Sequence, residues 1–372
     1  MRSVDTRFIR SSNGRRCSVV VTLKDVAAEA GVSPATVSYT LRGGQYVSEH
    51  TSKKVREAAD RLGYTINVAA RNLRYGRTGV IETVVRGLDL SSFYAHMVTH
   101  VRQSCEDRGY QAVFMQTEGE TQTIRNAVSK LNNQSCDGIL LDAGALAPRT
   151  VRSLSQNRPI VLLDDLSASP LFDTIYMPRD EMSRMATQYM IDIGCRNIAL
   201  IGAPQESDRH YRHGRNEPML QYKGFMSAMN DAGLSVTDKQ LVQDGWRYFK
   251  GVDIGHQMIR EGFDFDGAVC VNDSTALGLI RGLADGGVQV PRDLKVIGID
   301  GVSIGEFTVP RLTTIAVDMV DLAEKGIGML VERIEGKYDG KPRRMSVKYS
   351  LKVKESCGEG EAEPVVKTDS AA

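Results

Sequence analysis

The feature that most constrains this chain lies between residues 21 and 64, where three short amphipathic helical patterns are separated by turns of a few residues. Thr22 and Asp25 have the S/T-x-x-D/E spacing of a capping pair, which predicts that a helix begins at Leu23. Gly31 supplies the tight turn that ends this helix. The pattern therefore predicts a helix followed at once by a turn into a second helix.

The second helix starts within three residues, because Ser33 is a good N-cap and Pro34 a good first helical residue. A third helix is expected from about Thr51 to Leu62, capped near Ser48 and ended by a glycine. In proteins with so short a turn, the second helix lies in the DNA major groove. The alternative is an αα-hairpin inside a larger helical domain.

The outward face of the second helix carries the candidate DNA contacts. Ala35 offers only apolar contact, for which a thymine methyl is the obvious partner, whereas Tyr39 can hydrogen-bond a base edge or a phosphate. Pro34 lies on the same face. Short hydroxyl side chains suit phosphates, which position a protein without specifying sequence, and they occur at Ser33, Thr36, Ser38, Ser48 and Thr51.

The charge distribution agrees with a DNA-binding head. Residues 1–78 hold fourteen Lys and Arg against six Asp and Glu, whereas the rest of the chain holds 33 against 40. The formal net charge of +1 therefore conceals a basic head of net +8 and an acidic body of net −7. The head has the electrostatic footprint of DNA binding, and DNA would repel the body.

Length and composition indicate a soluble protein. At 372 residues the chain is too long for one ordinary domain, and its 41% hydrophobic and 25% charged residues are typical of globular proteins. No stretch approaches 18 apolar residues, and the N-terminus lacks the apolar core of a secretory signal. We therefore expect a cytoplasmic protein that makes no contact with a membrane.

Residue patterns for catalysis or metal binding are weak. Six scattered cysteines without a C-x-x-C pair predict reduced thiols and no zinc site. His96 and His100 have the i, i+4 spacing of two metal ligands, but no third ligand lies on that helical face, which favours solvated or packed histidines. A nucleophile elbow, a P-loop and a Gly-rich dinucleotide turn are missing. We expect no catalytic residue, no metal and no cofactor.

From Gly79 onward, short apolar runs alternate with helical patterns. The expected strands are VIETVV, AVFMQT, GILLDA, IVLLDD, IALIGA, AVCVN and KVIGID, with helical stretches such as 95–108, 181–193 and 274–285 between them. This alternation predicts parallel, doubly wound sheets, whose ligands bind beyond the carboxyl ends of the strands. Polar residues just after the strands are therefore candidate ligand contacts, although each is alternatively a helix N-cap: Asp164, Asn272, Asp273 and Asp300.

The segment VTLKDVAAEAGVSPATVSYTLRG, followed by VSEHTSKKVREAADRLGYTIN and AARNL, resembles the headpiece of the lactose-repressor (LacI/GalR) family of bacterial transcription regulators. The resemblance covers about residues 21–357, with CDGILL, PIVLLDD, IGCRNIALIG, FDGAVCVNDSTALGLIRGL, VPRDLKVIGIDG and PRLTTIAVD in order. It implies an all-α helix-turn-helix headpiece joined to a two-lobed, periplasmic-binding-protein-like effector domain. The chain would cross between the lobes three times, and a ligand cleft would lie between them.

The resemblance also implies a division of the chain. We expect a DNA-binding domain over 21–66, a hinge helix over 67–77, and an effector-binding domain over 78–357, with a first lobe at about 78–176 and 317–344 and a second at about 177–316 and 345–357. Residues 1–20 are basic, and are either a disordered DNA-contacting arm or an artefact of an upstream start codon. Residues 358–372 are predicted to be a disordered acidic tail.

The hinge segment NVAARNLRYG can form a helix that Asn67 caps. Ten residues are too few to hold a helix alone in water, so it should order only against its dimer mate and DNA. Leu73 matches the family's wedge residue, which enters the minor groove and kinks a base step; the alternative is a core leucine of the next domain. By the same resemblance, the DNA-binding set also includes Thr22, Tyr46 and Ala70.

The resemblance assigns Asp164, Asn272 and Asp300 to effector binding. Trp246 is the only tryptophan, and its spacing matches the aromatic platform of sugar-responsive members; core packing is the alternative. Further walls are expected from three aromatic residues that follow strands: Phe93, Tyr94 and Tyr176.

One departure from the family concerns the guanidinium that holds the effector. Members usually carry Arg three residues before the glycine of a GF pair, and here that position is Gln221. Either an Arg of the preceding long loop reaches the cleft, from among Arg209, Arg212 and Arg215, or the effector needs no guanidinium. Loss of this Arg argues against a carboxylate or phosphate ligand and favours a neutral sugar.

Together these features predict a homodimeric, sequence-specific repressor of carbohydrate-use genes that a small sugar releases from a palindromic operator. A purine, nucleoside or other metabolite acting through the same fold, even as a co-repressor, is the alternative. A solute-binding protein would need a signal peptide and no headpiece, and an enzyme would need a reactive constellation in the cleft.

We expect Leu73→Ala to weaken operator binding and to leave effector affinity nearly unchanged, because the wedge contacts only DNA. Anisotropy titrations with a palindromic operator measure the first affinity, and calorimetry measures the second. Equal operator affinity for the variant and the parent chain would contradict the wedge role.

Overall fold

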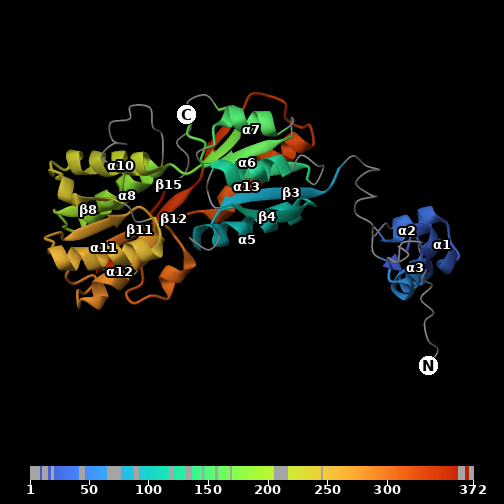
Figure 1. Cartoon of the computed structure of the whole chain (residues 1–372), viewed down its shortest axis with the longest axis horizontal. Helices are drawn as coiled ribbons and strands as arrows, with labels where there is room; N and C mark the ends of the chain where they lie inside the picture. The colour runs from blue at the N-terminus through green and yellow to red at the C-terminus, as the bar shows by residue number, and fades with distance from the viewer. Residues whose placement is uncertain are drawn as a thin grey trace. The chain divides into compact units, whose positions relative to one another are not determined.

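The computed structural model (Figure 1) describes residues 9–10, 16–17, 21–41, 47–64, 77–87, 92–117, 121–130, 136–144, 146–155, 158–167, 170–204, 217–243, 246–358 and 365–367. The chain divides into two compact units, Met1–Thr78 and Gly79–Ala372. No helix formed by the described residues has both the length and the apolar character needed to span a membrane.

The first unit contains α1 (Leu23–Ala30), α2 (Pro34–Leu41) and α3 (Glu49–Leu62). α1 begins as predicted, and the Thr22 N–H donates to the Asp25 carboxylate at 2.7 Å. Gly31 and Gly63 end α1 and α3 with left-handed φ angles of 66° and 62°, which glycine adopts without steric cost. α3 begins two residues before the predicted start, because Ser48 is its N-cap and accepts from the Thr51 N–H. The three helices enclose a small core of Val26, Ala27, Val37, Val55, Ala58 and Ala59.

Short strands lie within both segments for which disorder is predicted, and the disorder of the remaining residues stays a prediction. Within residues 1–20, β1 (Ile9–Arg10) pairs antiparallel with β2 (Arg16–Cys17). Within residues 358–372, β15 (Val365–Lys367) pairs antiparallel with β14 (Tyr349–Lys352) at the edge of a sheet. A sheet edge presents free backbone N–H and C=O groups to any extended segment, so pairing there does not depend on the polar composition from which disorder was predicted.

The second unit contains two sheets, each the centre of one lobe (Figure 1). The first lobe has the order β13 (Arg344–Ser346), β7 (Asp173–Tyr176), β6 (Ile160–Leu163), β5 (Gly138–Asp142), β3 (Val80–Arg86) and β4 (Gln111–Thr117), with every neighbouring pair parallel. The second lobe has the order β15, β14, β12 (Thr313–Val317), β11 (Lys295–Asp300), β10 (Gly267–Cys270), β8 (Ile198–Ala203) and β9 (Leu241–Gln243). Only β14 and β15 run antiparallel to their neighbours. The predicted fold class of parallel, doubly wound sheets is confirmed.

Helices cover both faces of each sheet. In the first lobe they are α5 (Ser92–Asp107), α6 (Thr121–Lys130), α7 (Pro148–Leu154) and α13 (Met319–Ile334). In the second they are α8 (Arg179–Asp192), α10 (Glu217–Asp231), α11 (Tyr248–Glu261) and α12 (Asp273–Asp285). On β5, Leu140 packs with the α5 and α13 side, whereas Ile139 and Leu141 pack with the α6 and α7 side. This alternation is the period of two that a strand imposes on its side chains.

The chain passes between the sheets three times: after β7, after β12 and after β13. All seven predicted strands are present, as β3, β4, β5, β6, β8, β10 and β11. The strands that the pattern did not predict include β7, β9 and β13, each only three or four residues long. Unlike the equally short β6 and β10, whose residues are all buried and apolar or small, these three strands include polar or charged residues and form no continuous apolar run.

α11 and α12 pack with their backbones in direct contact. A Cβ atom on Gly278 would lie 2.1 Å from the Tyr248 carbonyl oxygen, and one on Gly251 would lie 2.4 Å from the Thr275 carbonyl oxygen. Glycine at these positions lets two helices approach closely on one face of the second lobe.

We expect Gly278→Ala to destabilise the second unit by about 1–3 kcal/mol, because backbone atoms cannot move aside as a flexible side chain can. Gly328→Ala on α13 is the matched control: its Cβ would meet only an Arg108 nitrogen at 3.7 Å. That helical Gly-to-Ala change should be neutral or stabilise by roughly 0.5–1 kcal/mol. Urea unfolding followed by circular dichroism measures both, and equal stability of Gly278→Ala and the parent chain would contradict the close packing.

Candidate functional site: a charged cavity and a helical DNA-reading face

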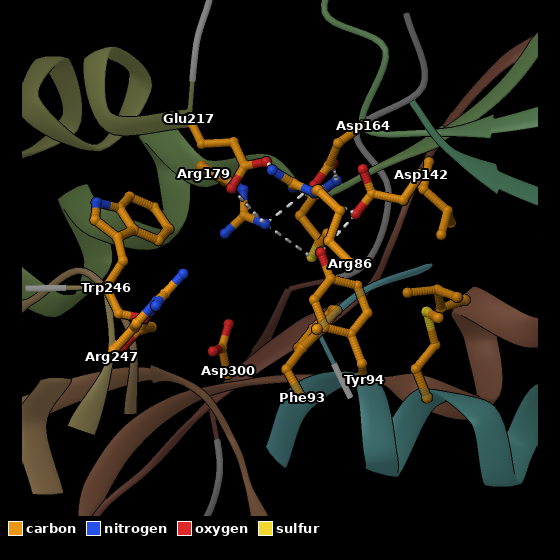
Figure 2. Close-up of a pocket in the computed structure, with 16 residues that line it drawn as sticks. Arg86, Phe93, Tyr94, Asp142, Asp164, Arg179, Glu217, Trp246, Arg247 and Asp300 are labelled. Atoms are coloured by element: carbon orange, nitrogen blue, oxygen red, sulfur yellow. Dashed lines mark hydrogen bonds and ion pairs between the residues drawn. The ribbon is translucent and has the colours of Figure 1, made fainter. Parts of the chain in front are cut away.

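A cavity of about 530 Å³ lies at the carboxyl ends of the parallel strands and takes residues from both lobes (Figure 2). Its volume is within the range of small-molecule sites, roughly 300–1,000 Å³. The lining residues are Arg86, Gly87, Phe93, Tyr94, Met97, Asp142, Leu163, Asp164, Met177, Arg179, Glu217, Trp246, Arg247, Asn272, Asp300 and Leu322. Of the predicted effector residues, Phe93, Tyr94, Asp164, Trp246, Asn272 and Asp300 are among them.

Strand ends bring polar side chains to this cavity. Arg86 is the last residue of β3, Asp142 the last of β5, and Asp164 follows β6 directly. These strands are parallel neighbours, so their carboxyl ends share one edge of the first sheet. Asp300 is the last residue of β11 in the second lobe.

The first pair of charges lies within the first lobe. Arg86 donates from Nε to Asp142 at 2.9 Å, and the Tyr94 hydroxyl donates to the same carboxylate oxygen at 2.5 Å. Burial opposes the charge of Arg86, but Asp142, Tyr94 and Glu217 outweigh it and hold its pKa above the ordinary value. The guanidinium therefore stays charged.

The second pair joins the lobes. Arg179, at the first turn of α8, donates from Nη2 to Asp164 at 3.0 Å, and Asp164 also accepts the Met177 N–H at 2.8 Å. Burial raises the pKa of Asp164 to about 6, against the opposing effect of Arg179. The carboxylate and the guanidinium are both more than nine-tenths buried.

Glu217, the first residue of α10, connects the two pairs. Its carboxylate lies 2.9 Å from Arg86 Nη2 and 3.4 Å from Arg179 Nη2, as Figure 2 shows. Burial would raise the pKa of Glu217, but the two guanidiniums lower it below the usual value. We call these five side chains the charge cluster: Arg86, Asp142, Asp164, Arg179 and Glu217.

Asp300 stands apart from this pairing. Its side chain points into the cavity in Figure 2, and it makes no hydrogen bond to any other residue that the structure describes. It is only 5% exposed and has φ 128°, a backbone conformation rare for a residue with a Cβ. Burial, with Asp273 nearby, raises its pKa well above the ordinary value. Such an isolated carboxylate is suited to accept hydrogen bonds from a ligand.

The alternative that polar residues after the strands are helix N-caps is confirmed for Asn272 but not for Asp273. Asn272 is the N-cap of α12, since its Oδ1 accepts the Thr275 N–H at 2.8 Å, and the same residue also lines the cavity. Asp273 is fully buried and accepts from the N–H groups of Gly301 and Val302 and from the Thr314 hydroxyl. Asp273 therefore fixes the turn after β11 and does not line the cavity.

Aromatic side chains form part of the wall. Phe93 and Tyr94 meet edge to face, with ring centroids 5.4 Å apart. Trp246 both lines the cavity and packs against the main core cluster, so the two sequence alternatives for this residue are not exclusive. Its indole lies on the same side of the cavity as Glu217 and Arg179 in Figure 2.

Two predicted effector residues lie elsewhere. Tyr176 is not part of the cavity lining; its ring is covered by the Arg344 guanidinium at 4.3 Å, because its side chain follows the parallel pairing of β7 with β13. Gln221 is fully buried and donates to the Val271 carbonyl at 2.7 Å. Its position one turn into α10 directs it into the second lobe. The loop arginines Arg209, Arg212 and Arg215 lie outside the described residues.

Sequence reasoning missed all five of these charged cavity residues: Arg86, Asp142, Arg179, Glu217 and Arg247. The rule that selects polar residues at strand ends would have found Arg86 and Asp142. For Arg179 the sequence offered a weaker indication. A cation is unfavourable at a helix N-terminus, so an arginine at that position implies an acidic partner. Guanidiniums therefore reach the cavity from Arg86, Arg179 and Arg247, and Gln221 does not supply one.

The predicted DNA contacts that the structure describes lie on α2 and at or next to the starts of α1, α2 and α3. Pro34, Ala35 and Tyr39 are exposed on α2, and Tyr39 has 55% of its surface exposed. Ser38 is half-buried beside them, and Thr22, Ser33 and Ser48 are exposed. The Ser33 hydroxyl accepts the Thr36 N–H, and the Ser48 hydroxyl accepts that of Thr51, so these side chains also cap helices. Tyr46, Asn67, Ala70 and Leu73 lie outside the described residues.

Metal ligation has little support in the described part of the chain, where no group of three His, Cys, Asp or Glu side chains converges. His96 and His100 approach within 3.4 Å through their Nε2 atoms. Burial, together with His100, lowers the pKa of His96. Five described cysteines are buried and are not joined in disulfides: Cys105, Cys136, Cys195, Cys270 and Cys357.

Comparison with protein families matches both units. Residues 22–67 match the model of bacterial regulatory proteins, lacI family, and residues 187–357 match a periplasmic binding protein-like domain. The ribose operon repressor of Escherichia coli strain K12 is 31% identical over 321 residues, covering 85% of this chain and 93% of that protein. The HTH-type transcriptional repressor PurR of Photobacterium profundum is 30% identical over 320 residues, covering 86% and 93%.

Solved structures show the same architecture. A transcriptional regulator CelR–cellobiose complex is 27% identical, with a TM-score of 0.64 over 90% of this chain and 99% of that one. The lac repressor dimer bound to operator and the anti-inducer ONPF is 24% identical, with a TM-score of 0.74 over 91% and 99% of the two chains. The second likeness concerns the fold alone.

We expect Asp300→Asn to stabilise the ligand-free protein at pH 8 by on the order of 1–3 kcal/mol, because it removes a buried charge that lacks a partner. The raised pKa means that the folded state holds the proton more tightly than the unfolded state. Stability from this group is therefore present at pH 4 and is lost as pH rises. The difference between variant and parent chain should shrink toward zero near pH 4. Urea unfolding at both pH values measures it, with exposed Asp253→Asn as the control for one lost charge, and a pH-independent difference would contradict the assignment.

Proposed function

Because the chain belongs to the LacI family of bacterial regulatory proteins, we propose that it is a cytoplasmic, homodimeric repressor of carbohydrate-utilisation genes. In this proposal the protein binds a palindromic operator, and a small neutral sugar in the cavity lowers its affinity for DNA. The observation that carries the proposal is the cavity itself, where aromatic side chains lie with a carboxylate, Asp300, that makes no side-chain hydrogen bond to the described residues. Relatives named for a ribose operon and for a cellobiose complex support the sugar class.

The cavity chemistry suits a sugar. One face of a sugar ring presents C–H groups, which pack on the Trp246 indole. Its hydroxyls can donate to Asp300 and pair with the Asn272 amide. Arg86 and Arg179 are both paired with carboxylates, which favours a ligand without a negative charge next to them, and Arg247 is the third guanidinium of the lining. We assign effector binding to Phe93, Tyr94, Asp164, Trp246, Asn272 and Asp300.

The headpiece supplies the DNA contacts in this proposal. The exposed face of α2 would enter the major groove, and the hydroxyls at the helix starts would contact phosphates. Residues 67–77 would form the hinge helix, with Leu73 as the wedge. Exposed Phe249, Phe307 and Val309 offer apolar surface for a second subunit.

The proposed mechanism is an equilibrium between two arrangements of the lobes. One brings the two hinge helices of a dimer together on the operator, and the effector stabilises the other. A coupling free energy of about 1–3 kcal/mol is the usual scale for such linkage. We assign no catalytic role, since the relatives that match most of the chain are named as transcriptional repressors.

A purine effector is the second candidate, because relatives named PurR match the chain nearly as well as the ribose operon repressor. A nucleobase would stack on the same aromatic wall and donate to Asp300. Under this alternative, the ligand could act as a co-repressor.

We expect Trp246 fluorescence to change saturably with one neutral sugar, because the only tryptophan lines the cavity. The titration uses the purified chain with a panel of neutral sugars and nucleobases, with and without a palindromic operator. Asp300→Asn should abolish the response, whereas exposed Asp253→Asn should retain it.

A response to nucleobases alone would reject the sugar class in favour of the purine alternative. Silence toward the whole panel, with operator binding intact, would contradict a role for the cavity in binding either class. Failure to bind any palindromic operator in a genome-wide selection would reject the repressor assignment.

A further inference from the structure

We infer that Arg179 is the guanidinium that reads the effector in this protein, and that Asp164 and Glu217 neutralise it so that it selects an uncharged oxygen over an anion. The inference deepens the proposed function, because it takes the cavity as the effector site. It names a specificity residue on α8 that was not among the predicted effector residues.

Ion pairs hold Arg179 in place but use only part of its hydrogen-bond donors. It is 6% exposed, and its guanidinium faces the cavity in Figure 2. Its hydrogen bonds and ion pairs with described residues all use Nη2, which reaches Asp164 at 3.0 Å and Glu217 at 3.4 Å. Nε is buried without a partner among the described residues. A guanidinium has five N–H donors, so this one retains donors for a ligand oxygen.

The neighbouring carboxylates remove the attraction for an anion. Arginine does not lose its proton in a protein, so a buried guanidinium must be balanced by acids. In the charge cluster, three carboxylates face two guanidiniums. A carboxylate or phosphate that reaches Arg179 would therefore lie beside the negative charges of Asp164 and Glu217. A hydroxyl, ring or carbonyl oxygen accepts a hydrogen bond without adding charge.

In this protein α8, and not α10, supplies the guanidinium to the cavity, whereas α10 supplies a carboxylate. Gln221, at the position where the resembling family carries Arg, is fully buried and bonded to the Val271 carbonyl. One turn earlier on α10, Glu217 reaches the cavity and presents a carboxylate. α8 then supplies the guanidinium through Arg179. The donor therefore approaches the ligand from the segment that crosses between the lobes.

The test removes the two neutralising charges and uses inorganic phosphate as the probe. In Asp164→Asn/Glu217→Gln, two guanidiniums face only Asp142, so the cluster gains a net positive charge. We expect this variant to bind phosphate at least about tenfold more tightly than the parent chain, which should show no saturable binding at millimolar phosphate. Isothermal calorimetry measures the affinity, and a thermal melt shows that the variant folds.

Two controls locate the effect. Asp253→Asn/Glu261→Gln removes the same two charges from the exposed face of α11 and should stay silent. Adding Arg179→Gln to Asp164→Asn/Glu217→Gln should abolish phosphate binding. Saturable phosphate binding by the parent chain, a folded double variant that ignores phosphate, or a triple variant that still binds it would each overturn the inference.

If the double variant does not fold, the phosphate titration uses Glu217→Gln alone. In that variant two carboxylates, Asp142 and Asp164, balance the two guanidiniums of the charge cluster. Its phosphate affinity should then exceed that of the parent chain, and equal exclusion of phosphate would overturn the inference. The titration needs neither DNA nor a sugar. Failure of the proposed function, seen as no operator or effector response, is therefore distinguishable from failure of this inference.

Discussion

The ion pairs around Glu217 are the interaction on which the site depends. Burying a guanidinium without a partner costs several kcal/mol, and here two are buried or half-buried at one cavity. Arg86 comes from the first lobe, whereas Arg179 and Glu217 come from the second. These ion pairs form only where the strand ends of the first lobe lie next to the first turns of α8 and α10 in the second lobe. The topology of the chain therefore decides which charges can pair.

This balance leaves one acid for the ligand. The carboxylates of the charge cluster are committed to arginines, and Asp273 to backbone N–H groups, but Asp300 keeps its acceptors free among the described residues. The backbone of Asp300 is itself in a strained conformation, with a positive φ. A buried acid without a partner lowers stability, and such costs persist where function needs them. These features support the proposal that the cavity binds a polar ligand of little charge.

Local rules predicted the elements well and the site in part. Caps at Thr22, Ser48 and Gly63 marked helix ends, because these signals act within one turn. Asp300 and Asn272 followed from the strand-end rule, and Trp246 from its spacing. Tyr176 and Gln221 were misplaced, since a residue near a strand end or on a helix is directed by its packing neighbours and not by its position in the chain.

The sequence by itself determined the helix-turn-helix, the alternation of strands and helices, and the family, because these depend on short-range periodicity and on motif order. Only the tertiary structure decided which charges meet. Arg86 and Glu217 are 131 positions apart, and Arg86 and Asp142 are 56 apart. Nothing local couples residues at such separations. The parallel register of β3 with β5, and the passage of the chain between lobes, bring them into hydrogen-bonding distance and fix the chemistry of the cavity.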